Sequence, residues 1–134
     1  MKSEFRFLLD TDTSSYIIRR IPKPLARAMH FSEQFAISSV TRFELGRARS
    51  ELRLPSSIEL LDGFLRDVPT LDFDAVAADA AGQIYSELER SGQRIGIPDS
   101  MLAGQALSLG LILVTNNQKH FERVQGLQIQ NWTQ

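Results

Sequence analysis

The 134-residue sequence contains no cysteine. It therefore excludes a thiol nucleophile, a disulfide framework and a zinc–thiolate site. No apolar run approaches the roughly 20 residues of a membrane-spanning helix, and the first residues lack the long apolar stretch and cleavage site of a signal peptide. We therefore expect a cytoplasmic protein without membrane contact.

A strong positive charge is also lacking, because the formal net charge is −1. Any nucleic-acid binding must therefore come from local patches. Twelve of the fifteen cationic residues are arginine. Arginine favours bidentate contacts with phosphate or carboxylate, although compositional drift between organisms explains the same bias. The length fits a single domain, residues 1–134.

Short apolar runs alternate with helical patterns along the chain. We expect helices after Asp10, at 25–29, after Ser38 or Ser39, at 55–65, at 76–90 and at 98–109. The runs typical of strands cover residues 5–9, 35–37, 68–73, 111–114 and 127–132. This alternation predicts an α/β fold with a central, mainly parallel sheet and helices on both faces. Ligands of such sheets bind outside the carboxyl ends of the strands.

Two local patterns give sharper expectations. Residues 21–24, with Pro22 and Pro24, are expected to break the first helix, before a second short helix at 25–29. In the helix at 76–90, an apolar stripe recurs every four residues opposite a polar face, and it consists of Val76, Ala80, Ile84 and Leu88, joined by Ala77 and Ala81. We expect this apolar stripe to pack against the core.

Asp10 directly follows the first apolar run, at the predicted carboxyl end of a strand. A helix cap is the alternative role, but Asp12 or Thr13 could fill it equally well. The position therefore favours a metal-binding or catalytic role for Asp10. Asp12 falls in the first helical turn, where a cap or a supporting acceptor is the better interpretation.

Glu44 and Asp99 are the other two candidate acids. Thr41 to Glu44 matches a capping box, but a cap at Ser38 or Ser39 would place Glu44 inside the helix, on the inner stripe. Asp99 follows a proline in a first helical turn, where the helix dipole alone favours a carboxylate. Gathering three carboxylates into one pocket is tolerable mainly around a divalent cation, which predicts Mg²⁺ or Mn²⁺.

Four further residues are candidates for supporting roles. Thr115 and Asn117 follow the apolar strand at 111–114, where a turn is the simpler interpretation and orientation of a water or a phosphate is the functional one. Arg47 lies about 60° from Glu44 on a helical wheel. With Arg94, it is the better candidate for a contact with RNA phosphate, because the other arginines of this helix face away from Glu44.

The chain resembles the PIN-domain ribonucleases, and most closely the VapC toxins of bacterial toxin–antitoxin pairs. The resemblance lies in residues 7–13, 37–45, 96–106 and 113–117, and ends at His120 and Phe121. It implies a three-layer α/β/α PIN fold in which Asp10, Glu44 and Asp99 hold the metal. It also implies an Mg²⁺-dependent endoribonuclease that cuts structured RNA such as tRNA, a VapB-like antitoxin, a homodimer and a bacterial cytoplasm.

One position departs from the family pattern. Many PIN domains carry a fourth acid where this sequence has Asn117. We therefore expect one well-held metal ion, with any second ion depending on bound RNA phosphate.

Three alternatives remain open from the sequence. Residues 8–13 also resemble the nucleophile motif of haloacid-dehalogenase-type phosphatases, and residues 113–116 resemble the second motif of that family. Such enzymes need a lysine and an acidic pair after the second motif, but only Lys119 and Glu122 remain in the short tail. A metal-independent ribonuclease would have only His30 and His120 for acid–base catalysis. The third alternative is a catalytically inactive PIN-like module that binds RNA, against which the presence of all three acids argues.

Overall fold

The computed structural model describes residues 4–134 and contains a five-stranded sheet of order β3-β2-β1-β4-β5. Every neighbouring pair of strands is parallel. The strands are β1 (Phe7–Leu9), β2 (Phe35–Ser38), β3 (Thr70–Leu71), β4 (Ile112–Val114) and β5 (Ile129–Gln130). The central strand β1 connects forward to β2 on one side, whereas β4 occupies its other side.

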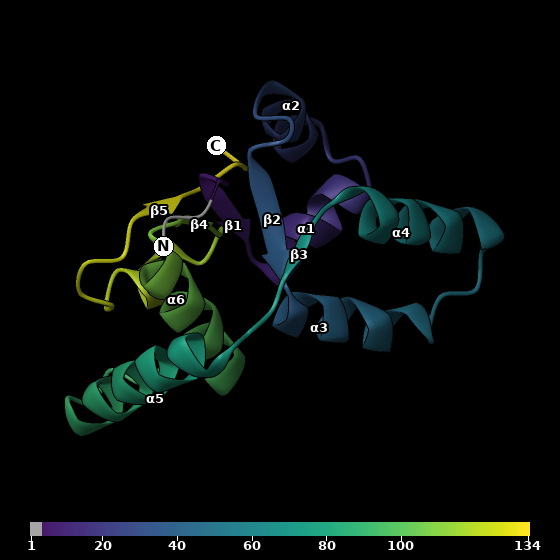
Figure 1. Ribbon diagram of the computed structural model, residues 1–134. Helices are drawn as coiled ribbons and strands as arrows, with labels where there is room; N and C mark the ends of the chain where they lie inside the picture. Colours follow the sequence, from purple (N-terminus) through teal and green to yellow (C-terminus); the bar gives the residue numbers. More distant parts are fainter. Residues whose placement is uncertain (1–3) are drawn as a thin grey trace.

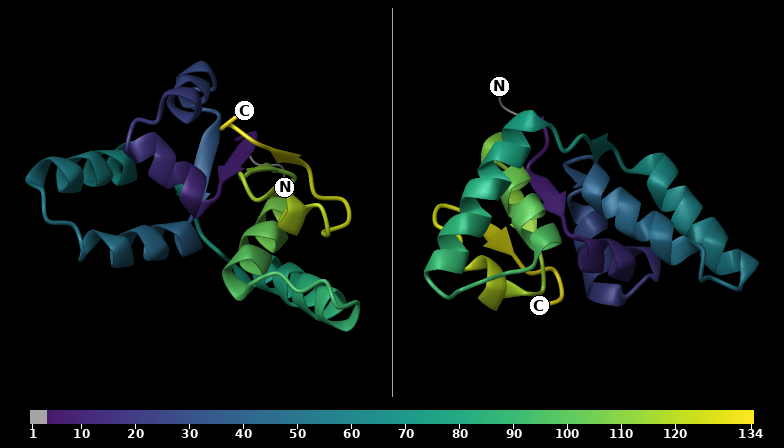
Figure 2. Two further views of the ribbon diagram at one scale, coloured as in Figure 1. Left: turned by 180° about the vertical axis from the view of Figure 1, so that it is seen from behind. Right: turned by 90° about the horizontal axis from the view of Figure 1, so that it is seen from below.

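Helices fill the connections between these strands. They are α1 (Thr11–Ile18), α2 (Pro22–His30), α3 (Ser39–Arg49), α4 (Pro55–Asp67), α5 (Ala75–Arg90), α6 (Ile97–Leu109) and α7 (Gln118–Phe121). Helices α1 to α4 gather on one side of the sheet, and α5 and α6 pair on the other (Figure 1, Figure 2). The predicted α/β/α architecture is therefore confirmed.

The central strand explains this layering, because successive side chains of a strand point to opposite faces. Leu8 packs in a core cluster with residues of α5 and α6. Phe7 and Leu9 pack in a second cluster with residues of α1 to α4 and with the fully buried Trp132. A three-residue strand buried on both faces thus joins the two halves of the core.

Two local predictions were wrong. Helix α2 begins at Pro22 rather than after the two prolines, because proline tolerates the first helical turn, where its missing N–H is not needed. Val76 is 65% exposed, and the core-facing stripe of α5 consists of Ala77, Ala81, Ile84 and Leu88. All four residues belong to the predicted stripe, and Val76 falls outside the buried face because a four-residue spacing drifts around a helix of 3.6 residues per turn. Within residues 4–134, no helix has the length and apolar character needed to cross a membrane.

Helices α5 and α6 approach each other closely at Gly104. A Cβ atom built there would overlap the backbone nitrogen of Ala81. Because backbone has no room to yield, we expect Gly104→Ala to lower the free energy of unfolding by about 1–3 kcal/mol. Gly82→Ala is the matched control on α5, since nothing lies within 4 Å of its Cβ position. Urea denaturation should show equal or higher stability for this control; equal stability of both variants would contradict the close approach.

Candidate active site at the carboxyl edge of the sheet

Asp10 directly follows β1. The chain runs from β1 to β2 on one side of the sheet and from β4 to β5 on the other. Parallel sheets bind ligands at this switch point, where neighbouring strands connect in opposite directions. The backbone N–H of Asp10 donates to the carbonyl oxygen of Val114 at 3.0 Å. Its carboxylate Oδ1 accepts from the backbone N–H of Thr13 at 2.8 Å, so Asp10 caps α1. The side chain therefore fills the helix-capping role that the sequence left open.

Burial makes the Asp10 carboxylate costly to ionise. Asp10 is buried, with only 6% of the residue exposed. This burial raises the pKa of its carboxyl group from 3.8 to about 6. Hydrogen bonds from Thr115 and Thr13 act in the opposite direction but are outweighed. The contact with Thr115 joins the end of β1 to the residue that follows β4. This arrangement confirms that Thr115 lies beside Asp10, and it leaves the buried charge without a cationic partner in the described part of the chain.

Glu44 reaches the same edge from α3. Its Oε1 accepts a hydrogen bond of 2.6 Å from the hydroxyl of Thr11, the residue after Asp10. That hydroxyl also lies 3.2 Å from the hydroxyl of Thr41. Thr11 thus ties the first helical turn after Asp10 to the second candidate acid.

The capping-box interpretation of Glu44 is wrong, because Ser38 caps α3 by accepting from the N–H of Val40. The expected inner stripe is also wrong in detail. Thr41 and Leu45 are the buried residues of α3, whereas Glu44 is half-buried at the edge of that face. A carboxylate at this edge keeps access to solvent and to a substrate.

Asp99 lies in the first turn of α6, next to His120. The Oδ2 atom of Asp99 and the Nδ1 atom of His120 are 3.4 Å apart. The same ring nitrogen lies 2.9 Å from the side-chain amide of Asn117. Asn117 therefore meets Asp99 through a histidine, at the start of α7.

The remaining predicted residues have different surroundings. Asp12 is exposed in the first turn of α1, and its predicted capping role is wrong because Asp10 caps that helix. Arg47 lines the same cavity as Glu44. Arg94 lies in the connection between α5 and α6, where its guanidinium is 3.4 Å from the carboxylate of Glu89.

The three acids thus come from three elements, but they do not form a closed ligand set. Among residues 4–134, no group of three or more histidine, aspartate or glutamate side chains is arranged to hold a metal ion. The donor chemistry nevertheless fits a hard divalent cation, which prefers carboxylate oxygens. Because burial removes water from the carboxylate of Asp10, this side chain would gain the most from a bound cation.

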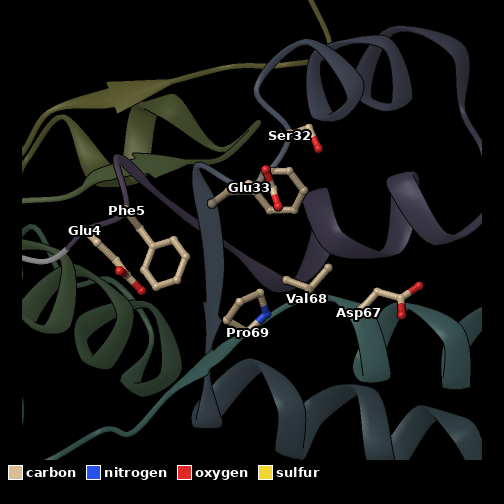
Figure 3. A pocket seen from close by; sticks show the side chains of 8 residues that line it. Glu4, Phe5, Ser32, Glu33, Asp67, Val68 and Pro69 are labelled. Carbon is tan, nitrogen blue, oxygen red and sulfur yellow. The ribbon is translucent and has the colours of Figure 1, made fainter.

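A separate cavity of about 520 Å³ lies at the opposite, amino edge of the sheet. Its lining residues precede β1, β2 and β3, except Phe35, which is the first residue of β2. Figure 3 shows Glu4 and Asp67 at its two ends, with Phe5, Pro69 and Val68 between them. Since parallel sheets bind ligands at their carboxyl edge, we assign the functional site to the edge that carries Asp10.

Two site contacts were not predicted from the sequence. The hydrogen bond from Thr11 to Glu44 joins residues 33 positions apart. From the sequence, His120 was a candidate only for metal-independent catalysis. The structure places it against Asp99. Its position three residues after Asn117 and directly before a buried phenylalanine was the available signal.

The chain belongs to the PIN-domain family. Its parallel sheet carries acids at the carboxyl edge, and residues 7–127 match the family model of the PIN domain. This match spans most of the described residues and includes all three candidate acids.

Similarity to particular relatives narrows the family to its VapC branch, as the sequence predicted. The chain is 38% identical to the tRNA(fMet)-specific endonuclease VapC of Shigella flexneri, covering 96% of this chain and 98% of that protein. It is 36% identical to ribonuclease VapC2 of Haemophilus influenzae, covering 95% and 98%. The crystal structure of DNA-bound VapBC from Salmonella typhimurium matches with a TM-score of 0.88 and 37% identity, covering 96% of this chain and 98% of the matched chain.

Proposed function

We propose that this VapC ribonuclease is an Mg²⁺-dependent endonuclease that hydrolyses a phosphodiester bond in structured RNA, with tRNA as the substrate class. The observation that carries the proposal is the buried carboxylate of Asp10 at the switch point of the sheet. Relatives named as tRNA(fMet)-specific endonucleases support the substrate class.

In this proposal Asp10, Glu44 and Asp99 hold the ion, and Mn²⁺ can replace Mg²⁺. The ion supplies a Lewis acid that activates water and neutralises charge developing on the phosphate. Thr115 and Thr13 fix the Asp10 carboxylate, and Thr11 fixes that of Glu44. These hydroxyl and amide donors restrict the rotamers of the acids before RNA arrives.

Two alternatives lose support. A dehalogenase-type phosphatase conflicts with the family match over residues 7–127. A two-histidine mechanism requires His30 and His120 to share a site, but His30 ends α2 before β2 begins, whereas His120 lies in α7 after β4. In a parallel sheet these positions fall at opposite edges.

The proposal includes two protein partners and two phosphate contacts. Solved relatives are VapBC complexes, so we infer a VapB-like antitoxin for this chain. The homodimer of the toxin is implied by the resemblance to VapC toxins. Arg47 is the stronger phosphate candidate because it lines the cavity of Glu44. Arg94 is the weaker candidate because Glu89 already compensates its charge.

Cleavage of purified RNA tests the proposal. We expect the protein to cut tRNA(fMet) in Mg²⁺, leaving 5′-phosphate and 3′-hydroxyl ends, and to stop in excess chelator. Asp10→Asn should be inactive at every Mg²⁺ concentration. Cleavage that persists in chelator would contradict the metal requirement, and an uncut RNA pool despite tight RNA binding would identify an inactive binding module.

A further inference from the structure

A cavity of about 470 Å³ adjoins Glu44, within the size range of ligand pockets. Helix α3, the segment after β3 and the first turns of α6 form its walls. The lining residues are Ser39, Val40, Phe43, Glu44, Arg47, Phe73, Pro98 and Met101. One candidate metal ligand therefore shares its cavity with two aromatic rings and a guanidinium.

Neither ring belongs to the two core clusters of the described residues. Phe43 is 68% exposed and belongs to neither core cluster. Phe73 is partly buried and is also outside both clusters. Phe43 and Arg47 are four residues apart on α3, so their side chains lie on the same helical side. Among residues 4–134, no carboxylate lies within ion-pair distance of Arg47.

We propose that this cavity is a subsite for the base of a nucleotide next to the cleaved phosphodiester. The base stacks on Phe43 and Phe73, and Arg47 contacts the adjoining phosphate. The inference rests on the proposed ribonuclease function, because RNA cut beside Glu44 must have a neighbouring nucleotide close to this cavity. Aromatic rings beside a positive charge are the usual platform for unpaired bases, and they tolerate different bases because every base has a π face.

A second cavity continues from the first and shares Phe73 and Met101 with it. Tyr85 and the exposed Ile97 line its far side. A protein partner would also cover such an apolar surface, since aromatic residues, methionine and arginine are enriched in protein interfaces. Glutamate is depleted in them, and Glu44 in the first cavity is a proposed ligand of the metal ion, so RNA is the occupant that the proposed function brings to this cavity.

RNA binding by a cleavage-deficient protein tests the subsite. In the Asp10→Asn background, Phe43→Ala should weaken the affinity for tRNA(fMet), measured by fluorescence anisotropy, by about 5- to 150-fold. Phe43→Trp should preserve the affinity, since it keeps a stacking surface. Val76→Ala is the matched control, because Val76 is similarly exposed on α5 and lines neither cavity. Its affinity should equal that of the parent.

Sedimentation and antitoxin binding of the same variants separate the alternatives. Unchanged RNA affinity for Phe43→Ala would overturn the subsite, and an accompanying loss of the dimer or of the antitoxin complex would identify a protein interface instead. Failure of the proposed function looks different, because the unsubstituted protein would then cut no RNA, whether or not the Asp10→Asn protein binds it.

Discussion

Asp99→Asn is expected to reduce RNA cleavage by more than about 100-fold, beyond the 10- to 100-fold typical of residues that only support a metal ligand. The substitution removes a negative charge but preserves the shape of the side chain. The free energy of unfolding of the metal-free protein should remain equal or rise. If the three acids form one metal site, as proposed, the relief of their repulsion in the metal-free protein should match or exceed the lost helix-dipole stabilisation of about 0.3–1 kcal/mol.

Single-turnover cleavage and urea denaturation in chelator are the two measurements. Asp79→Asn provides the control, because Asp79 is an exposed carboxylate on α5, and both its activity and its stability should be unchanged. Severe destabilisation of the metal-free Asp99→Asn protein would instead show that Asp99 serves α6 and its contact with His120 as a structural residue.

Asp10→Asn is expected to stabilise the metal-free protein at pH 7.5 by up to about 3 kcal/mol. Burial raises the folded-state pKa of Asp10 from 3.8 to about 6, so folding favours the protonated carboxyl. The stabilising contribution is complete below pH 3.8 and is lost as pH rises to about 6. Asparagine avoids this loss and still caps α1.

The difference in stability between the two proteins should therefore be small near pH 4 and reach its full size above pH 6. Urea denaturation in chelator at pH 4, 6 and 7.5 measures it. Added Mg²⁺ should then stabilise only the protein that retains Asp10. Lower stability of Asp10→Asn at pH 7.5 in chelator would show that the fold already stabilises the ionised carboxylate without a cation.

The sequence was most informative where one physical rule dominates. Short apolar runs bounded by polar residues predicted the parallel sheet, and proline at the start of α4 and α6 marked the helix beginnings. The same rule failed at α2, because proline both breaks helices and begins them. The α5 stripe was wrong only at Val76, because a strict four-residue spacing drifts around a helix of 3.6 residues per turn.

The site was predictable in its acids but not in their partners. The position of Asp10 after an apolar strand fixes it at the edge of the sheet. The contacts of Thr11 with Glu44 and of His120 with Asp99 depend on how α1 meets α3 and how α7 meets α6. Local sequence patterns do not contain such long-range packing. The cavity beside Glu44 likewise arises only when α3, α6 and the segment after β3 come together.

Calorimetric titration of Mn²⁺ into the RNA-free protein tests most directly whether the three acids act as one metal site. We expect one Mn²⁺ ion to bind per chain. The affinity for Mn²⁺ should fall at least about 10-fold in each of Asp10→Asn, Glu44→Gln and Asp99→Asn. Absence of binding to the unsubstituted protein, or an affinity unchanged by Glu44→Gln and Asp99→Asn, would contradict this expectation.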